Sequence, residues 1–496
     1  MPYADGTDTT SATREKEGGT RVASSAVDAT QDASSLRAED ITVTDPKVVK
    51  RAVAAATVGN ITEWYDFGVY GYFILTLQKV FFAGMSDTAS LIAAFGVFAS
   101  SFLVRPIGGL IFGSLGDRIG RTKVLAMTVI LMAASTFCIG LVPSYDSIGI
   151  AAPILVLLAK LGQGLSTGGE YSGSMTFIAE YTPDKRRGFT GSWLEFGTFT
   201  GYSLGAATVA ILTAVMPEDD LLSWGYRIPF LLALPLGMVG LFLRLRLEET
   251  PAFEKLLEEQ SEHQHDESKA GVRAVFVHYW RAILLCGGIV ITWNITNYML
   301  TSYIPTYLAD LPEFGLGGGV DQTATQFMQI AVLVMLIVLI PIIGRLSDRV
   351  GRRPVLATGA IGLIVLSLPA VLLLRGGTVV STFAGLLILG LMLACFSGTA
   401  PSTLPALFPT QVRYSGLAIS FNIFVSLFGG TTALVMSTLL SATKDLNWPG
   451  YYLIAAGAIG LVSIALITEP NGKPLPGATP AVSTHEEAHA LVASQD

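Results

Sequence analysis

The chain alternates between long apolar stretches and short polar connections. Each apolar stretch has roughly the 20 residues that an α-helix needs to cross the hydrocarbon core of a membrane. No segment shows the alternating pattern, about ten residues long, that is typical of a transmembrane β-strand. We therefore predict an all-α membrane protein with twelve transmembrane helices. Their expected ranges are 52–77, 89–113, 123–142, 151–178, 188–215, 225–246, 280–307, 324–346, 354–374, 380–406, 414–440 and 449–468.

The composition also indicates that lipid surrounds most of the chain. Only 14% of the 496 residues are charged, against about 25% in soluble globular proteins. The net charge of −7 comes largely from tails and loops, and nothing in it points to a nucleic-acid partner. Cys138, Cys286 and Cys395 lie inside apolar stretches without metal-like spacing, so we expect no disulfide framework and no metal site. Nucleotide-binding loops and nucleophile elbows are also missing, and we expect neither an enzyme nor a cofactor.

A repeated motif and one long polar stretch divide the chain into two pseudo-symmetric six-helix halves. GSLGDRIGRTK (113–123) recurs as GRLSDRVGRRP (344–354), with Gly, Leu, Asp, Arg, Gly and Arg at one constant offset. Such internal repeats are typical of transporters that rock around a central site. The predicted parts are a disordered tail (1–47), a first half (48–246), a linker (247–279), a second half (280–469) and a short tail (470–496).

Lysine and arginine residues predict the orientation of the bundle. Most of them fall in the tails and in the connections after the even-numbered helices, and the positive-inside rule places this side in the cytoplasm. The other side carries few cations and the acidic residues Glu218, Asp219 and Asp220. We therefore expect a multi-pass protein of the cell membrane with both termini in the cytoplasm. The acidic first tail and the linker are candidate contacts for the bilayer, and anionic lipids are candidate partners.

The two repeated loops resemble the signature loop of the major facilitator superfamily. Asp117 and Asp348 are expected to pair with arginine side chains or with the N-terminus of a neighbouring helix. Pairs of this kind hold one conformation and break in the other. The alternative is that the arginines of the motif only anchor the topology. The expected gating residues here are Asp117, Arg118, Arg121, Asp348, Arg349 and Arg352.

Longer stretches narrow the resemblance. GNITEWYDFGVYGYF (59–73), GGEYSGSMTFIAEYTPDKRRGF (168–189) and WGYRIPF (224–230) are similar to the metabolite:proton symporter family, and most of all to its osmosensory branch. This resemblance covers roughly 45–470 and implies uptake of proline, glycine betaine or ectoine with protons. The tail after Glu469 departs from the pattern, because it is short and has no heptads of a coiled coil.

Two carboxylates in the first helix are candidates for proton coupling. Glu63 and Asp66 lie near the middle of the span and three residues apart, so they share one face of the helix with Asn60 and Tyr70. Two buried carboxylates this close do not ionise together easily, which suits a proton carrier. The alternative is that Glu63 only bonds to a partner helix. All five histidines lie at or beyond a span edge.

Cations and aromatic groups within the spans are candidates for substrate binding. Lys160, with Gln163 one turn further on, is expected near mid-depth and is favoured for a substrate carboxylate. Arg105 lies deeper, and an ion pair with Glu170 or Glu195 is an equally good interpretation of it. In the seventh span, Trp293, Asn294, Asn297 and Tyr298 are expected to bind a quaternary ammonium group through π faces and amides. Ordinary helix packing accounts equally well for Trp293 and Asn297.

Three functions remain open from the sequence. The first is a symporter that takes up a small zwitterionic solute with protons. The second is a symporter of organic acids such as citrate, oxoglutarate or shikimate, for which two cations near each other at mid-depth are expected. The third is a membrane sensor that keeps the fold without transport. The paired carboxylates argue against the third function.

Overall fold

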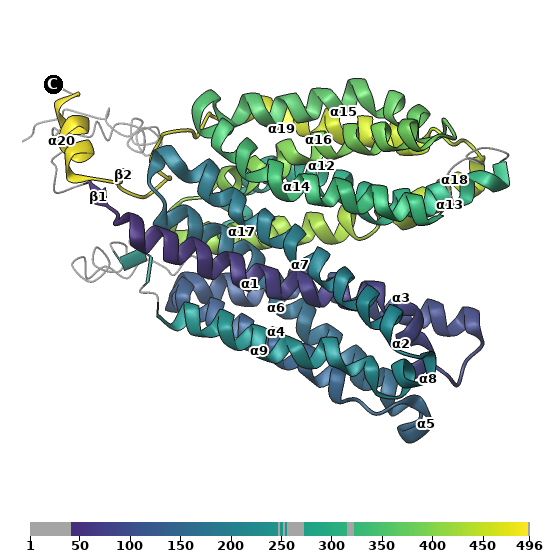
Figure 1. The fold of residues 1–496 in the computed structure, drawn as a ribbon. Helices are drawn as coiled ribbons and strands as arrows, with labels where there is room; N and C mark the ends of the chain where they lie inside the picture. Colours follow the sequence, from purple (N-terminus) through teal and green to yellow (C-terminus); the bar gives the residue numbers. More distant parts are fainter. Residues whose placement is uncertain (1–40, 247–248, 251–252, 255–271, 315–321, 495–496) are drawn as a thin grey trace, which may run out of the picture.

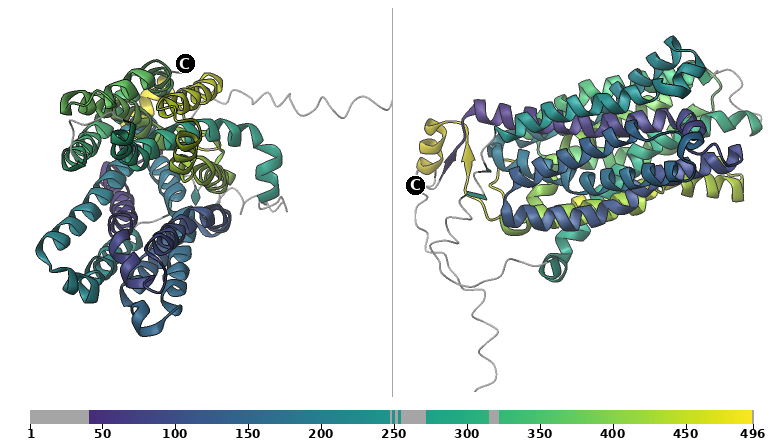
Figure 2. Two further views of the ribbon diagram at one scale, coloured as in Figure 1. Left: turned by 90° about the vertical axis from the view of Figure 1, so that its right-hand side faces the viewer. Right: turned by 90° about the horizontal axis from the view of Figure 1, so that it is seen from below.

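A computed structural model describes residues 41–246, 249–250, 253–254, 272–314 and 322–494 of the chain (Figure 1). The long helices run roughly parallel or antiparallel to one axis and form two groups, which the end-on view of Figure 2 separates clearly. The helices of the first group come from the first half of the chain and those of the second group from the second half. This arrangement confirms the predicted all-α bundle with two six-helix halves.

The first half contains nine α-helices and two short helical turns in its described residues. They are α1 (Pro46–Tyr72), α2 (Ile74–Phe81), α3 (Asp87–Ile119), α4 (Arg121–Leu141), α5 (Tyr145–Ile148), α6 (Ala151–Tyr181), η2 (Asp184–Arg186), α7 (Arg187–Val215), α8 (Glu218–Asp220), η3 (Leu221–Gly225) and α9 (Arg227–Leu245). Six of them, α1, α3, α4, α6, α7 and α9, correspond to the predicted spans.

The second half repeats this pattern with two interrupted spans. Its described elements are α11 (Val272–His278), α12 (Trp280–Tyr298), η4 (Met299–Tyr303), α13 (Ile304–Asp310), η5 (Leu311–Phe314), α14 (Gln322–Val350), α15 (Arg352–Leu374), α16 (Val379–Thr403), η6 (Leu404–Leu407), η7 (Thr410–Val412), α17 (Arg413–Phe424), η8 (Val425–Gly429), α18 (Thr432–Thr443), α19 (Trp448–Leu466) and α20 (His485–Ala493). The π-helical turns η4 and η8 interrupt the seventh and eleventh spans. Such turns often occur at functional sites.

Within the described residues, ten of the twelve long helices are apolar enough by composition to cross a membrane. The two that are less apolar are α1 and α6. These helices carry the buried charged residues Glu63, Asp66, Lys160 and Glu170. Because ionisable groups inside a membrane are costly, their concentration on two neighbouring helices indicates where the functional site lies.

The repeated motif folds in the same way in both halves. The sequence predicts that α3 ends at residue 113, but the helix continues to Ile119 and the turn is confined to Gly120, with φ 108°. Gly351 follows α14 with φ 101°, a conformation that favours glycine. The next helix is capped each time by a glutamate from a distant segment: Glu249 accepts from the backbone N–H of Arg121, and Glu469 from that of Arg352, both at 3.0 Å.

Glycines allow α3 and α6 to pack closely. A Cβ atom added to Gly168 of α6 would lie 2.2 Å from the backbone oxygen of Arg105, and one added to Gly108 of α3 would lie 2.1 Å from that of Leu165. Small residues at crossings of this kind are typical of membrane helix pairs. The crossing brings Arg105 of α3 next to the polar face of α6.

The two ends of the described chain are paired. β1 (Thr42–Val43) and β2 (Ala481–Val482) form a two-stranded parallel sheet, and α1 begins at Pro46 with Asp45 as its cap. The predicted tail boundary at residue 47 is therefore wrong for residues 42–46, because the strand pairing orders them. Residues 1–40 and most of the predicted linker, 247–279, lie outside the described residues.

The segment after α19 lies across both halves at one end of the bundle. The Arg187 guanidinium of α7 donates to the Lys473 carbonyl at 2.8 Å, and the Arg413 guanidinium of α17 donates to the Pro476 carbonyl at 2.7 Å. The backbone N–H of Ala481 donates to the Asp184 carboxylate at 3.1 Å. The described part of the short predicted tail, residues 470–494, is thus folded at this end.

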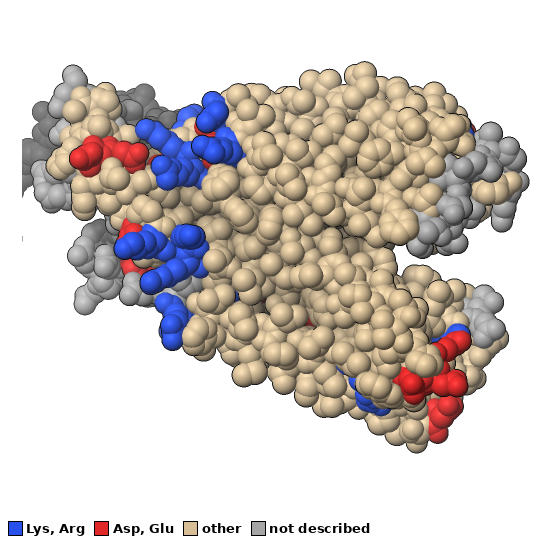
Figure 3. Space-filling model, in the orientation of Figure 1, with Lys and Arg blue, Asp and Glu red and all other residues tan. Residues whose placement is uncertain are grey.

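Charge separates the two ends of the bundle. Lys and Arg side chains gather at the end that carries β1, β2 and the two repeated motifs, which we name the basic end, and Glu218, Asp219 and Asp220 mark the opposite, acidic end (Figure 3). The halves touch at the basic end, where α3 and α6 pack against α17, and α7 against α14 and α16. At the acidic end Figure 3 shows a cleft between them.

Candidate functional site

The two carboxylates predicted on α1 are both buried, with Glu63 1% and Asp66 0% exposed. The Asp66 carboxylate accepts a short hydrogen bond from the Thr136 hydroxyl of α4. The amide of Gln163 donates to the same hydroxyl at 2.6 Å. Neither oxygen of Glu63 meets the strict geometry of a hydrogen bond in the described part of the chain, although the Thr167 hydroxyl of α6 acts on this carboxylate. Both interpretations of Glu63, as a proton carrier and as a bond to a partner helix, therefore stay predictions.

Lys160 lies in an aromatic cage of the first half. Its Nζ atom is 4.0 Å from the centre of the Tyr70 ring, 5.3 Å from that of Phe67 and 5.6 Å from that of Phe98. It is fully buried and has no hydrogen-bond partner among the described residues. The nearest charge that acts on it is Asp66. Cation–π attraction therefore replaces part of the lost hydration of the ammonium group.

Arg105 shares the Phe67 ring with Lys160. Its Cζ atom lies 4.8 Å from the centre of that ring and 4.2 Å from that of Phe102. The guanidinium also interacts with the Tyr298 hydroxyl of α12, whereas its Nε and Nη2 atoms have no hydrogen-bond partner in the described residues. Two buried cations thus lie close to one phenyl ring, and one of them contacts the second half through Tyr298.

A small cavity of about 30 Å³ lies beside Arg105, between the two halves. Residues from α1, α7, α12 and η4 line it: Trp64, Thr198, Phe199, Tyr202, Asn297, Tyr298, Thr301 and Ser302. Its volume is enough for about one water molecule. The ring of Tyr298, which lines the cavity, meets the Phe102 ring edge to face, with 5.9 Å between their centres. The predicted residues Asn297 and Tyr298 line this cavity, but the sequence did not indicate Trp64 or Tyr202.

The other residues predicted to bind substrate have structural contacts instead. Trp293 is 4% exposed, donates through its indole N–H to Ser397 at 2.9 Å and packs against Tyr171 and Phe421. Asn60 ties α1 to α7 through the Leu194 carbonyl, at 2.6 Å, and Asn294 donates to the Val290 carbonyl of its own helix. None of these three lines the cavity. For Trp293, the packing interpretation fits this conformation better than the binding one.

The predicted ion pair between Arg105 and Glu170 or Glu195 is wrong. The Glu170 carboxylate is paired with Arg244 of α9, whose Nη1 atom donates to it at 2.8 Å. Glu195 accepts hydrogen bonds from the hydroxyls of Tyr171 and Thr198. Sequence reasoning assigned Arg244 to the membrane surface, although it is 3% exposed. Gly59 of α1 makes room for it, since a Cβ there would lie 2.3 Å from Arg244 Nη2.

Asp117 and Asp348 of the repeated motif each bind the beginning of a helix in the opposite half. Asp117 Oδ2 accepts from the backbone N–H of Ser415, in the first turn of α17, at 2.8 Å. Asp348 accepts from the backbone N–H groups of Gly188 and Phe189, in the first turn of α7, at 2.6 and 2.8 Å. A carboxylate at a helix N-terminus stabilises the exposed donors and the helix dipole. These contacts close the basic end.

The arginines of the motif fall into two groups. Arg121 and Arg352 are fully buried, and their side chains lie 3.3 Å from Asp117 and 3.9 Å from Asp348. Arg118 and Arg349 are exposed and have no ion pair among the described residues. For this second group, anchoring the topology is the better interpretation.

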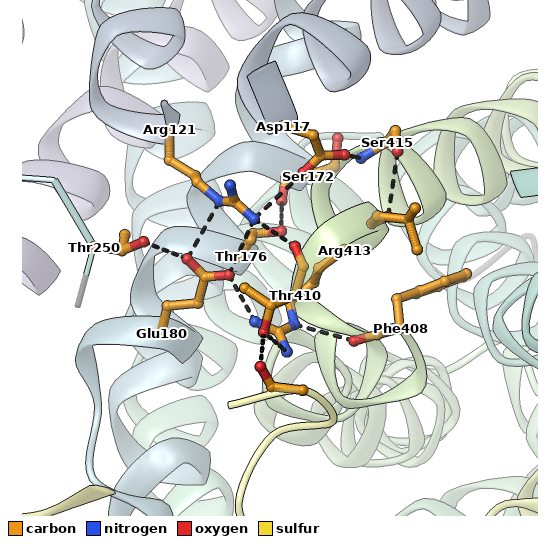
Figure 4. A network of polar contacts seen from close by, with 12 residues as sticks. Asp117, Arg121, Ser172, Thr176, Glu180, Thr250, Phe408, Thr410, Arg413 and Ser415 are labelled. Atoms are coloured by element: carbon orange, nitrogen blue, oxygen red, sulfur yellow. Dashed lines mark hydrogen bonds and ion pairs between the residues drawn. The ribbon is translucent and has the colours of Figure 1, made fainter. Parts of the chain in front are cut away.

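A buried network joins the halves beside Asp117 (Figure 4). The Glu180 carboxylate at the end of α6 accepts from Arg413 Nη1 at 2.6 Å, and its other oxygen lies 3.3 Å from Arg121 Nε. Arg121 also donates to the Thr410 carbonyl at 2.8 Å. Sequence reasoning missed Glu180 because the fourth span was expected to end at residue 178. No local pattern pairs Glu180 with Arg413, which lies in the other half of the chain.

The comparisons with known proteins agree with this arrangement. A family model described as "Sugar (and other) transporter" matches residues 52–471. The chain belongs to this family. It is therefore a multi-pass membrane protein of the major facilitator superfamily, as the repeated motif predicted.

Relatives of known name cover almost the whole chain. The chain is 46% identical over 457 residues to the proline/betaine transporter of Escherichia coli (strain K12). The aligned region covers 91% of this chain and 90% of the relative. It is 45% identical to the glycine betaine/proline/ectoine/pipecolic acid transporter OusA of Dickeya dadantii (strain 3937), over 92% of this chain and 90% of the relative. The ectoine/proline transporter ProP of Corynebacterium glutamicum is 42% identical, over 93% and 92%.

Solved structures share the fold at lower identity. The proton:xylose symporter XylE superposes with a TM-score of 0.69 at 18% identity, over 90% of this chain and 99% of that chain. The human organic anion transporter MFSD10 has a TM-score of 0.60 at 14% identity, over 85% and 99%. These likenesses establish the major facilitator fold.

Replacing Glu180 by Gln should destabilise the protein strongly. The substitution keeps the shape of the side chain but leaves Arg413 without its counter-charge and leaves Arg121 with Asp117 alone. Loss of one partner of a buried ion pair costs roughly 3–5 kcal/mol. We expect a clear fall in the thermal unfolding midpoint of the purified protein in detergent.

The matched control is Glu218→Gln at the acidic end. There the Lys79 ammonium donates to the exposed Glu218 carboxylate at 2.6 Å and holds the pKa of that carboxyl below its usual value. Exposed pairs contribute little to stability, so the midpoint should stay unchanged. Equal shifts in the two variants would contradict the proposed importance of the buried network.

Proposed function

We propose that this chain imports small zwitterionic solutes, namely proline, glycine betaine or ectoine, together with protons. The observation that carries this proposal is 46% identity, along nine-tenths of the chain, to a proline/betaine transporter. Two buried carboxylates and two buried cations in the first half support it, because a zwitterion needs an opposite charge or a π face at each end. Uptake in response to osmotic stress belongs to the same proposal.

The orientation of the bundle follows from its charges. We place the basic end, with both termini, in the cytoplasm of the cell and the acidic end outside, as the positive-inside rule requires. In this orientation the structure is closed toward the cytoplasm, and the cleft between the halves opens to the outside (Figure 3). It then represents the state that receives solute from outside, and transport requires the contacts at Asp117 and Asp348 to break.

Glu63 is the favoured proton carrier and Asp66 the second candidate. Glu63 is fully buried, and the charges that act on it are those of Glu170, Arg105 and, more weakly, Arg244. Protonation would remove a charge that is balanced mainly by Arg105, whereas Asp66 accepts a hydrogen bond from Thr136 and has Lys160 near it. A proton on Glu63 therefore changes the charge that Arg105 offers to a solute.

The carboxylate of the solute is proposed to bind Arg105 rather than the predicted Lys160. Arg105 has two donor atoms without a hydrogen-bond partner among the described residues, and it contacts Trp64 and Tyr298 of the cavity lining, whereas Lys160 is enclosed by its aromatic cage. The ammonium end would meet the rings of Trp64 and Tyr202, which line the same cavity. Because the cavity is far smaller than a betaine molecule, the side chains around it must move apart on binding.

Uptake by proteoliposomes tests the function. When the medium outside the proteoliposomes is more acidic than their interior, labelled proline or glycine betaine should accumulate inside. A protonophore should abolish this accumulation, and liposomes without the protein should show none. Excess ectoine should compete, whereas citrate and oxoglutarate should not, because among the described residues Arg105 is the one cation that contacts the cavity lining while Lys160 is enclosed by its aromatic cage. Competition by the di- and tricarboxylates alone would transfer the assignment to the organic-acid alternative. A complete lack of uptake would favour the sensor.

Glu63→Gln should uncouple transport from the proton gradient, since the amide cannot change charge. We expect gradient-driven accumulation to fall to the level of equilibration while exchange of labelled for unlabelled solute persists. Asp66→Asn should retain accumulation, and the double variant tests whether the two carboxylates replace each other. Full accumulation by Glu63→Gln would rule out its role.

Asp117→Asn and Asp348→Asn should slow conformational exchange without abolishing solute binding. A hydrogen bond to a charged acceptor contributes roughly 1.5–3 kcal/mol, so each substitution disfavours closure at the basic end. We expect several-fold slower uptake, with solute affinity in detergent largely preserved. Asp219→Asn, at the exposed acidic end, is the control. Unchanged uptake in both gate variants argues against a latch, and lost binding would move the solute site to the basic end.

A further inference from the structure

A second, larger groove opens on the outer surface of the first half at the basic end. It has a volume of about 460 Å³ and lies between the first turns of α1 and α7, with β1 and β2 at its edge. Its walls are apolar and include Val53, Val58, Phe189 and Trp193. The Phe189 and Trp193 rings meet edge to face, with 6.1 Å between their centres. The transport cycle proposed above makes no use of this groove.

Two cations line the groove at its polar end. Lys50 and Arg186 are exposed there, and neither forms an ion pair within the described residues. The acids nearest to them in sequence have other partners: Asp45 caps α1 by accepting from the backbone N–H of Lys47, and Asp184 pairs with Arg187. The groove therefore presents uncompensated positive charge above an apolar floor.

The dimensions of the groove suit a lipid that stands in one leaflet. Lys50 and Val58 are eight residues apart on α1, which corresponds to about 12 Å along the helix. Cations at one end and aromatic and aliphatic groups below them match the order of groups in a phospholipid. Aromatic residues at this level are typical of the membrane interface, and basic pockets between helices bind anionic head groups.

We propose that this groove binds one anionic phospholipid of the leaflet at the basic end. Its phosphate lies between Lys50 and Arg186, and an acyl chain packs against Val53, Phe189 and Trp193. The same turn of α7 supplies the backbone N–H of Phe189 to Asp348 of the other half. A bound lipid therefore supports the helix end on which closure of the basic end depends, and favours the closed state.

Native mass spectrometry of the purified chain with added phosphatidylglycerol or phosphatidylcholine tests the site. One molecule of phosphatidylglycerol should bind in preference to phosphatidylcholine. If each cation near the surface contributes roughly fivefold to affinity, the double variant Lys50→Gln/Arg186→Gln should lose roughly 25-fold. Arg118→Gln/Arg349→Gln removes the same charge from exposed positions of the same end and should leave binding unchanged.

Two outcomes would overturn the proposal. Equal losses in the two double variants would show diffuse attraction to a basic surface, and equal binding of the two lipids by the unmodified chain would show that the groove does not select an anionic head group.

A second measurement does not depend on charge variants. Phosphatidylglycerol with brominated chains should quench more tryptophan fluorescence than brominated phosphatidylcholine, and Trp193→Phe should remove the excess. An excess that persists in Trp193→Phe places the lipid elsewhere.

Discussion

A charge buried in a membrane protein needs a compensating group. The structure meets this need in one way at the basic end and in another way in the middle of the bundle. At the basic end every buried charge of the network has a partner: Glu180 holds Arg121 and Arg413, and the motif aspartates hold helix ends. In the middle of the bundle, Glu63, Arg105 and Lys160 lack hydrogen bonds or have free donor atoms within the described residues. The paired charges hold the halves together at the basic end, and the incompletely paired ones are the proposed sites for a proton and a solute.

The aromatic rings explain how two such cations persist in the centre. The centre of the Phe67 ring lies 5.3 Å from Lys160 Nζ and 4.8 Å from Arg105 Cζ. The ring attracts both cations without neutralising either of them. A carboxylate in the same place would instead hold both cations in ion pairs.

The sequence predicted the fold and the helices that carry the site, because both depend on local patterns. Spans follow from apolar length, the halves from the repeated motif, and the importance of α1 from the spacing of Glu63 and Asp66. Partners across the halves follow no local pattern. The pairing of Glu180 with Arg413, the choice of Arg244 for Glu170 and the burial of Trp293 against Tyr171 depend on how helices cross. Those features needed the structure.

The gate has a consequence for how its residues vary. Asp117 and Asp348 accept from main-chain N–H groups, which every residue except proline supplies. Ser415 and Phe189 can therefore change identity without losing the bond, whereas Gly188 cannot easily do so, since a Cβ there would lie 2.6 Å from Asp348 Oδ1. A search for a co-varying residue at the contacts with Ser415 and Phe189 would therefore find little signal, although both aspartates hold the halves together there.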